Sequence, residues 1–479
     1  YGGARSVAPF PSGGASTGAE FAGTHAVTLD DYRHLWKVYL SDPDLREARA
    51  RWPFVMTWDD HEFTDDSWQG FSTYEGTPVP AQARKIAANQ AWFEFVPVHL
   101  SGRVEPDEAP ARDFQAAEVR NAPRAGVDDA GIDTDPNNRR ALRSLTIYRS
   151  LRWGRNLDLV VTDLRSYRSE HPVPAELSEA IGGVARYVQP LPLVEACDAG
   201  REFMGGNPPA QLDLGGQTIP NPRMDAPAGT MMGPEQKAWF KRRMAGSDAR
   251  WKIWANSVPL MPMRLDLDRI DPAATTVVFT IDTWDGYLRE RTELLDFLAE
   301  SGVEGVISLS GDNHNSFAGR LLRDFGSRGS EAVGCEYSVC GISSPSLWSA
   351  MVGFVAEDDP LRPLVVHEGK AALNLTFLDG AAASATLAQT GDLAAARAAA
   401  NPDQNPHLAY CDSEANGFGV VHLSGEVAEV ELVTIETPLA DTGPSGARVL
   451  RTARFTQRLD DPDALAGPTI EGAPPFPLG

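Results

Sequence analysis

The chain has 479 residues, which suits one large α/β enzyme core with long insertions or two to three smaller units. Its 66 acidic and 43 basic residues leave a net charge of −23, which argues against a protein that binds nucleic acid by neutralising phosphates. Hydrophobic residues make up 42%, enough for a sizeable core, and apolar runs such as Gly305–Leu309 are far too short to cross a bilayer. We therefore expect an acidic globular protein.

Residues that typically begin or end a helix mark the first elements of the chain. Residues 1–25 are rich in Gly, Ser and Ala and predict a loop. Thr28 followed by Asp31 matches a capping box and predicts a helix directly after it. A second helix is expected to begin at Asp42-Pro43, where proline is tolerated, and to end at Trp52-Pro53, because proline disfavours a helical residue before it.

Further along, strands alternate with helices, which predicts an α/β layered fold. Residues 103–140 and 170–230 are rich in Pro, Asp, Asn and Gly, as is typical of long surface insertions. The other predicted elements are, in chain order, a buried strand over Phe54–Trp58, a hairpin of Leu145–Trp153 with Leu157–Thr162, a helix from Gly233 to near Gly246, a strand over Trp251–Ala255, a helix over Tyr287–Glu300, a strand over Gly305–Leu309 and an alanine-rich helix near 380–400.

The four cysteines do not decide the compartment. They match no zinc-binding spacing. Two disulfides in an exported protein and four buried free thiols both remain open. They are Cys197, Cys335, Cys340 and Cys411. The chain begins at Tyr1 and shows no signal peptide, so we expect that a preceding segment was removed or left out.

A first cluster of ionisable residues follows the predicted strand over Phe54–Trp58. Carboxylates packed together repel one another, and one of them would stay protonated without a counter-charge. A bound cation is the ordinary remedy, because it keeps the acids ionised. A solvated acidic turn is the alternative. The cluster comprises Asp59, Asp60, His61 and Glu62, with Asp65 and Asp66 shortly after.

A second cluster follows the predicted strand over Gly305–Leu309. Gly311 allows a sharp turn, after which Asp312 and His314 can reach the same side. The alternative is a hairpin turn with a capping Asp and a surface His. Ligands of α/β sheets bind at the carboxyl ends of strands, and both clusters are predicted there. Carboxylate and imidazole ligands favour Ca, Mn, Fe or Zn.

Three further positions offer weaker signals. Asp163 and Arg165 follow another predicted strand, where Arg could hold a phosphate in bidentate fashion or form a surface salt bridge. Asn256 directly follows the predicted strand over Trp251–Ala255, and its side chain could donate its amide or coordinate a cation. The turn Asp282–Tyr287 could line the pocket or lead into the next helix. The glycine pairs of the chain lack the strand–loop–helix context of a phosphate-binding loop, and the stretch Gly311–His314 is not a G-x-S-x-G nucleophile motif.

With these motifs in place, the chain resembles the PhoD-like alkaline phosphatase family, a branch of the metallophosphoesterases. The W-D-D-H-E and G-D-x-H blocks occur in that order, about 250 residues apart, and are specific in combination. The resemblance covers Thr28–Glu62, Tyr148–Arg168, Met232–Met263, Asp282–Ala318 and Cys411–Val433.

The resemblance implies a fold, a reaction and a set of roles. The fold would be a two-layer β-sandwich core flanked by helices (α/β/β/α), with a catalytic domain over 1–440 and a surface tail over 441–479. The protein would hydrolyse phosphate esters after export, as a secreted or periplasmic enzyme with a dinuclear or larger centre of iron and calcium and a metal-bound hydroxide. By the resemblance, Asp60, Asp312 and His314 would ligate metals, and His61 would lie beside the leaving group as an acid or as a phosphate contact. From the residues themselves we add Asp59 as a metal ligand and Arg165 and Asn256 as substrate contacts.

The chain also departs from the family pattern. Asp65-Asp66 stands where relatives often have an Asn pair, which leaves the role of this pair open. A first metal-binding block of Gly-Asp with a nearby Tyr, and a ligating Cys, would precede Tyr1. We therefore expect a separate N-terminal fragment that supplies Asp, Tyr and Cys ligands, or a chain that cannot hold its metals alone. A phospholipase D-like phosphodiesterase and a non-catalytic calcium-binding relative are the alternative functions.

Overall fold

The computed structural model describes residues 9–16, 24–73, 77–96, 113–181, 184, 186–214, 216–438 and 446–478. The chain divides into two compact units. The first comprises the described residues of Tyr1–Ser150, Val161–Glu170 and Gly229–Phe240, and the second those of Leu151–Val160, His171–Ala228 and Lys241–Gly479. Within these described ranges, no helix has the length and apolar character that a bilayer crossing requires.

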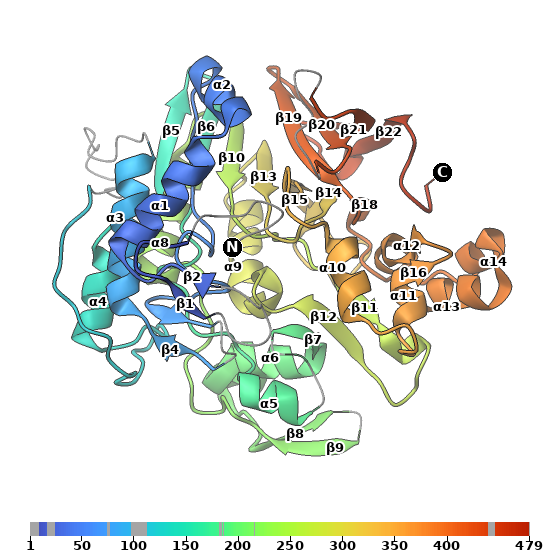
Figure 1. The fold of residues 1–479 in the computed structure, drawn as a ribbon. Helices are drawn as coiled ribbons and strands as arrows, with labels where there is room; N and C mark the ends of the chain where they lie inside the picture. The colour runs from blue at the N-terminus through green and yellow to red at the C-terminus, as the bar shows by residue number, and fades with distance from the viewer. Residues whose placement is uncertain are drawn as a thin grey trace. The chain divides into compact units, whose positions relative to one another are not determined.

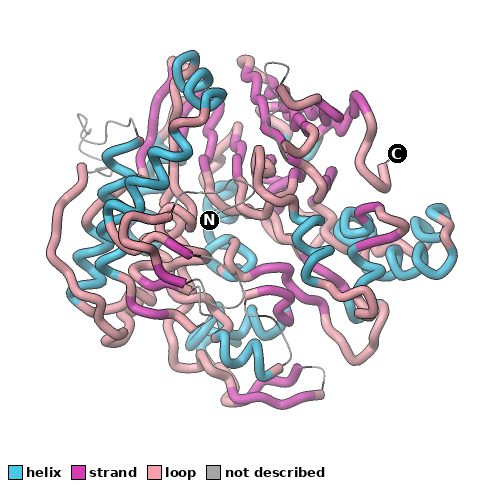
Figure 2. The backbone as a smooth tube through the Cα atoms, in the orientation of Figure 1, coloured by secondary structure: helices cyan, strands magenta, loops and turns pink. Residues whose placement is uncertain are grey.

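Loops connect the helices of the first unit, and its regular structure is mostly helical (Figure 2). Its helices are α1 (Leu29–Leu40), α2 (Pro43–Arg51), α3 (Gln82–Phe95) and α4 (Pro136–Arg143), and its strands pair as β1 (Ala15–Ser16) with β2 (Thr24–His25) and β3 (Phe71–Ser72) with β4 (Val79–Pro80). The predicted capping box is confirmed, because the Thr28 side chain accepts from Asp31 N and the Asp31 side chain accepts from Thr28 N. The second helix begins and ends where proline predicts.

The predicted strand over Phe54–Trp58 is wrong. No β-ladder in the described chain includes this segment, and Phe54 and Val55 are exposed. Its apolar side chains suggested a strand, but a strand also requires a neighbour for its backbone groups. Here the segment is held by side chains instead. Arg149 Nη2 donates to Met56 O at 2.7 Å, and Thr57 Oγ1 donates to Thr162 O at 3.0 Å.

The second unit is built on a seven-stranded mixed sheet, in which β10, β13 and β15 are parallel and β14 runs antiparallel to β15 and β18. The strand order is β18 (Leu408–Asp412), β14 (Ser316–Leu322), β15 (Ala332–Ser338), β13 (Val306–Ser310), β10 (Trp251–Ala255), β6 (Leu157–Val161) and β5 (Arg149–Trp153). The predicted strand over Trp251–Ala255 is confirmed. The predicted hairpin is also present, but β5 begins four residues later than expected and β6 ends one residue earlier, and β13 begins one residue later than expected. The α/β class is therefore correct.

A four-stranded antiparallel sheet belongs to the same unit (Figure 1). Its strands are β19 (Asn416–Leu423), β20 (Val427–Ile435), β21 (Val449–Arg458) and β22 (Ala466–Gly472). Side chains of both sheets join one buried cluster, which includes Trp251, Ile307 and Tyr337 from the larger sheet and Val430 and Phe455 from the smaller. The range 441–479, expected as a surface tail, contributes β21 and β22.

The range 170–230, expected as a surface insertion, contains regular elements of its own. They are α5 (Ala175–Ala180), β7 (Tyr187–Pro190), α6 (Leu191–Ala199), η1 (Gly200–Glu202), α7 (Phe203–Gly206), β8 (Gln211–Leu214) and β9 (Gln217–Pro220). β7 joins β12 (Thr276–Thr280) and β11 (Arg264–Asp266) in a three-stranded sheet. Leu193 and Val194 of α6 are fully buried in the same cluster as Val278 and Ile281. This segment is therefore part of a hydrophobic core.

The remaining elements lie mostly in the second unit. α8 (Gly233–Gly246) and α9 (Leu288–Glu300) confirm two predicted helices, and α9 packs against β15. The others are η2 (Leu267–Arg269), η3 (Trp284–Gly286), α10 (Leu347–Phe354), α11 (Arg362–Val365), β16 (Val366–His367), β17 (Lys370–Ala371), α12 (Ala372–Asp379), α13 (Ala381–Thr390), α14 (Leu393–Ala398) and η5 (Pro462–Ala464). The single helix expected near 380–400 is two helices, because Gly391 ends the first in a left-handed conformation.

The cysteines are free and buried, which decides between the two possibilities left open by the sequence. Burial raises the pKa of the Cys340 thiol to about 11 and that of Cys197 to about 12, because a thiolate is poorly solvated there. Buried thiols of this kind are inert.

Candidate metal centre

A single tight turn in the first unit carries the first cluster of ionisable residues. It starts at Asp60, whose carbonyl oxygen accepts from the backbone N–H groups of Phe63 and Thr64. The Asp60 carboxylate is fixed at both ends, since Oδ1 accepts from His61 N at 2.6 Å and Oδ2 accepts from Asp66 N at 2.8 Å. Asp66 itself adopts a φ of 43°, a left-handed conformation that is uncommon for a residue with a side chain. Such backbone strain is concentrated at functional sites in proteins.

Three side chains of this turn converge. One ligand atom each of Asp60, His61 and Asp65 lies within 4.8 Å of the other two, and no other group of three His, Cys, Asp or Glu residues does so in the described part of the chain. His61 Nε2 is 3.5 Å from Asp65 Oδ1 and 3.7 Å from Asp60 Oδ2. Two carboxylates and an imidazole are a donor set that suits a hard or borderline cation. The residues present therefore fit a metal ion.

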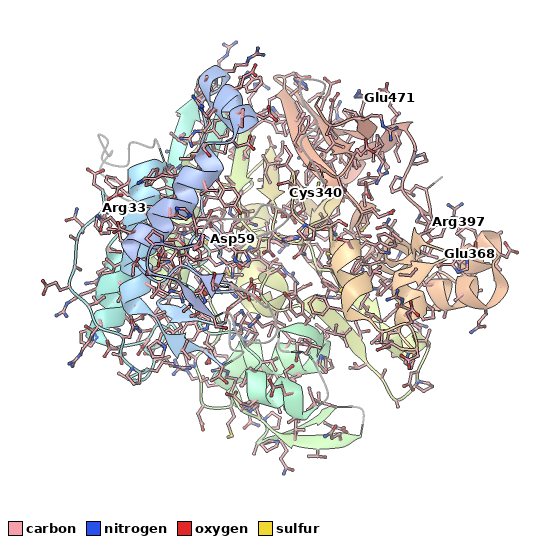
Figure 3. All side chains as sticks on the ribbon, in the orientation of Figure 1. Arg33, Asp59, Cys340, Glu368, Arg397 and Glu471 are labelled. Carbon is pink, nitrogen blue, oxygen red and sulfur yellow. The ribbon has the colours of Figure 1, made fainter. Side chains whose placement is uncertain are left out.

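Asp59, one residue earlier, also forms an ion pair (its side chain is labelled in Figure 3). Arg165 Nε donates to Asp59 Oδ1 at 2.8 Å and Arg165 Nη2 donates to Oδ2 at 3.0 Å, a bidentate arrangement. The Arg165 side chain is fully buried, whereas that of Asp59 is 23% exposed. The Arg165 guanidinium thus supplies positive charge directly beside the acidic turn.

The loop that carries Arg165 is held by Asp163. Its Oδ1 accepts from the backbone N–H groups of Arg165 and Ser166 at 3.1 and 2.9 Å, and from the indole Nε1 of Trp58 at 2.9 Å. Asp163 therefore positions the loop and the indole rather than facing solvent.

Glu62 and Lys85 add two unusual ionisable groups. Burial, followed by the nearby Asp59 carboxylate, raises the pKa of Glu62 to about 7. Burial lowers the pKa of Lys85 to about 8. The Lys85 ammonium lies 4.8 Å from the centre of the Trp58 ring, within cation–π range. Lys85 is thus a partial counter-charge close to the acidic turn.

In the second unit, the carboxyl ends of neighbouring parallel strands meet as the sequence predicts. Asn256, directly after β10, donates its backbone N–H to Leu309 O of β13 at 2.9 Å. Gly311, directly after β13, donates to Ser257 O at 3.2 Å. Asn256 and the loop that carries Asp312 therefore lie at the same edge of the seven-stranded sheet.

Asp312 and His314 both adopt left-handed backbone conformations, with φ of 69° and 54°. Such conformations are usually found at glycine, and neither of these residues is a glycine. His314 Nδ1 is 2.7 Å from Pro345 O. A carbonyl oxygen only accepts, so Nδ1 carries the hydrogen and Nε2 keeps its lone pair. This is the tautomer in which metal-ligating histidines are usually held.

The sequence analysis did not identify Pro345 as part of the candidate site, and it named Asp65 without giving it a role. Pro345, which sets the His314 tautomer, is 31 residues further along, and no sequence signal points to its carbonyl. Asp65 carried a signal, because residues four apart face the same side of a helical turn and it stands four after His61.

Comparison with known proteins assigns the chain to a family. The family model described as PhoD-like phosphatase matches residues 11–432. The chain belongs to the PhoD-like phosphatase family. Both acidic blocks fall within the matched range, which confirms the resemblance.

Two PhoD-like relatives are similar over large parts of the chain. Alkaline phosphatase D of Bacillus subtilis (strain 168) is 24% identical over 319 residues, which are 66% of this chain and 40% of that protein. A solved structure of PhoD matches with a TM-score of 0.57 and 18% identity, covering 95% of this chain and 62% of that one. This structural similarity shows that the chain shares the fold of PhoD. The chain thus spans less than two thirds of the length of either relative.

Proposed function

We propose that the chain is a metal-dependent hydrolase of phosphate esters, of the alkaline phosphatase or phosphodiesterase type. The observation that carries the proposal is the convergence of Asp60, His61 and Asp65 on one strained turn. Membership of the PhoD-like family supports it, as does the relative named alkaline phosphatase D.

We infer that cations are held by Asp59, Asp60, Asp312 and His314, and we add Asp65. Iron and calcium are the cations we propose. When bound, they would polarise the P–O bonds and lower the pKa of a water that attacks phosphorus. The fixed Asp60 carboxylate and the His314 tautomer both favour such a role, because neither side chain has to reorganise.

The other predicted residues would act on the ester itself. Of the three converging side chains, we assign Asp60 and Asp65 to a cation and His61 to the leaving group as its acid, because the His61 side chain is 41% exposed and a substrate can reach it. Arg165 and Asn256 are the proposed contacts of the phosphoryl oxygens. Arg165 uses two of its five N–H donors on Asp59, which holds the guanidinium plane in place.

Three more detailed expectations from the resemblance are part of the same proposal. They are the α/β/β/α sandwich, export to the cell exterior or periplasm, and the 1–440 extent of the catalytic domain. The shared cluster of the two sheets in the second unit supports the sandwich.

Metal removal and restoration test the function. The protein would be treated with a chelator and then supplied with iron, calcium, manganese or zinc singly and in pairs. Hydrolysis of p-nitrophenyl phosphate and bis(p-nitrophenyl) phosphate is then measured in parallel. We expect metal-restored release of p-nitrophenolate, with the ratio of the two rates giving the preference for monoesters or diesters. Metal binding without hydrolysis of either ester would instead favour a calcium-binding protein.

A further inference from the structure

The side-chain amide of Asn256 is fixed in one orientation. Asn256 is only 3% exposed. The indole Nε1 of Trp284 donates to Asn256 Oδ1 at 3.2 Å. An indole N–H can only donate, so the amide must present its oxygen to Trp284. The Nδ2 group, with its two hydrogens, is thereby directed away from the indole.

This Nδ2 group has no hydrogen-bond partner among the described residues. A buried donor that stays unpaired costs free energy, and most such groups in proteins are paired. Asn256 stands at the carboxyl end of β10, beside the loop that begins at Gly311, which is where α/β sheets bind ligands. The unpaired donor is therefore at a place where a ligand can pair with it.

Trp284 is itself held firmly by the turn around it. Asp285, the next residue, accepts from Met263 N at 2.9 Å and from Arg291 Nη1 at 2.8 Å. Gly286 cannot carry a side chain, because a Cβ there would collide with Ile281 O. The ring of Trp284 also packs edge-on against Trp254 of β10, with centroids 5.8 Å apart. The indole thus has little freedom to move.

Met263 links this turn to the loop of the second cluster. Its backbone N–H bonds Asp285, and its Sδ accepts from Asn313 Nδ2 at 3.3 Å. Asn313 lies between Asp312 and His314 in the sequence. The amide of Asn256, the Trp284 turn and the Asp312–His314 loop therefore form one connected set of contacts.

We propose that Asn256 Nδ2 donates to an oxygen of the phosphoryl group, and that Trp284 is a positioning residue that aims this donor. The inference rests on the proposed function and deepens it. The ligand is an oxyanion, because an amide nitrogen with two hydrogens offers no lone pair to a cation. Of the two roles that the sequence left open for Asn256, donation is the one that this geometry supports.

Binding of inorganic phosphate to the metal-supplemented protein tests the inference by calorimetry. Asn256→Asp keeps an acceptor for Trp284 but replaces the donor with a carboxylate oxygen, so phosphate should bind at least about tenfold more weakly. Trp284→Phe keeps the ring and removes the N–H, and should weaken binding about three- to tenfold. The double variant should lose no more than Asn256→Asp alone, because the indole acts through the amide.

Trp251→Phe is the matched control. Its indole, also buried in β10, donates to Ser424 O at 2.8 Å, so its removal should leave phosphate affinity unchanged. Phosphate affinity within twofold of wild type in Asn256→Asp would overturn the inference, as would a wild type that binds no phosphate. Losses that multiply in the double variant would refute the positioning role of Trp284. Should Asn256→Asp fail to fold, Trp284→Phe against Trp251→Phe carries the test. A wild type that binds phosphate but hydrolyses no ester would contradict the proposed function alone.

Discussion

His314 turns its Nδ1 to within 2.7 Å of the Pro345 carbonyl oxygen, and this one contact decides which ring nitrogen is free to bind a metal. The backbone N–H of Leu347, the first residue of α10, donates to His314 O at 2.8 Å, so both the ring and the backbone of His314 are held by the start of α10 and the residues just before it. A left-handed residue with a side chain is costly unless its surroundings hold it. The strain at His314 is therefore retained by contacts that also fix the imidazole.

Replacement of His314 should weaken metal binding. For His314→Ala we expect at least a tenfold loss of Mn²⁺ affinity, since even indirect support of a ligand is typically worth 10- to 100-fold. Calorimetric titration of the chelated protein measures it. His422→Ala, an exposed histidine of β19 in the same unit, is the control and should bind as wild type does. Equal affinity of His314→Ala and wild type would remove His314 from the ligand set.

His61→Ala should lower turnover by roughly 10²–10⁴ if His61 protonates the leaving group. The loss should depend on the substrate. An alkyl phosphate leaves as a strongly basic alkoxide that needs the proton, whereas p-nitrophenolate leaves with little help. Steady-state rates on both substrates check this difference. A loss of the same size on both would assign His61 to binding instead of proton transfer.

The Asp59–Arg165 ion pair should behave as a buried one. Arg165→Met leaves Asp59 without its partner and should destabilise the protein by about 3–5 kcal/mol. The pair Asp59→Asn with Arg165→Met should cost less than the sum of the two single changes. Urea unfolding followed by tryptophan fluorescence gives these values.

Arg33→Met provides the comparison for that pair. Arg33 bonds Glu94 at 2.6 Å, but both side chains are about 30% exposed (31% and 30%; Arg33 is labelled in Figure 3). Its loss should destabilise the protein far less than that of Arg165, because solvent screens an exposed ion pair. Similar costs at Arg165 and Arg33 would show that burial of Arg165 has no energetic consequence.

Asp198 should make the protein less stable as the pH rises from about 4 to 7. Burial raises its pKa from 3.8 to about 7 in the folded chain, although Oδ2 accepts from Arg289 N at 2.9 Å. Between these two values the folded state holds a proton that the unfolded state has released, so the free energy of unfolding falls with pH and then levels off. Asp198→Asn should remove that fall, which is a few kcal/mol at about 1.4 kcal/mol per pKa unit. Urea unfolding of both proteins from pH 4 to 8 measures it, and parallel curves would contradict the assignment.

The sequence predicted correctly those helix ends that depend only on residues next to one another in the chain. The capping box of Thr28 and Asp31 and the proline at the start of α2 need only neighbouring residues, and both are present in the structure. The strand expected over Phe54–Trp58 is absent, because a strand depends on residues that are distant in the sequence. Its composition is that of a strand, but strand formation depends on a partner that no nearby residue specifies.

The candidate site shows the same division. Asp60, His61, Asp312 and His314 were proposed because ionisable residues gathered after apolar runs, and Asp65 was named with the first cluster but given no role. The contacts that orient these groups were not visible. Trp284 reaches Asn256 from 28 residues away, and Pro345 reaches His314 from 31. Left-handed conformations at Asp312 and His314 also lack a sequence signal, because glycine is absent from both positions.

Metal content and phosphate release, determined on the same samples of wild type and Asp60→Asn, test the central claim most directly. Asp213→Asn, an exposed aspartate of β8, is the control. The account predicts that the wild type and the control retain metal on gel filtration and release phosphate from an ester, whereas Asp60→Asn loses metal and at least about 100-fold of the rate, in line with a contribution of several kcal/mol from the cation. Asp60→Asn with the metal content and rate of the wild type would contradict it.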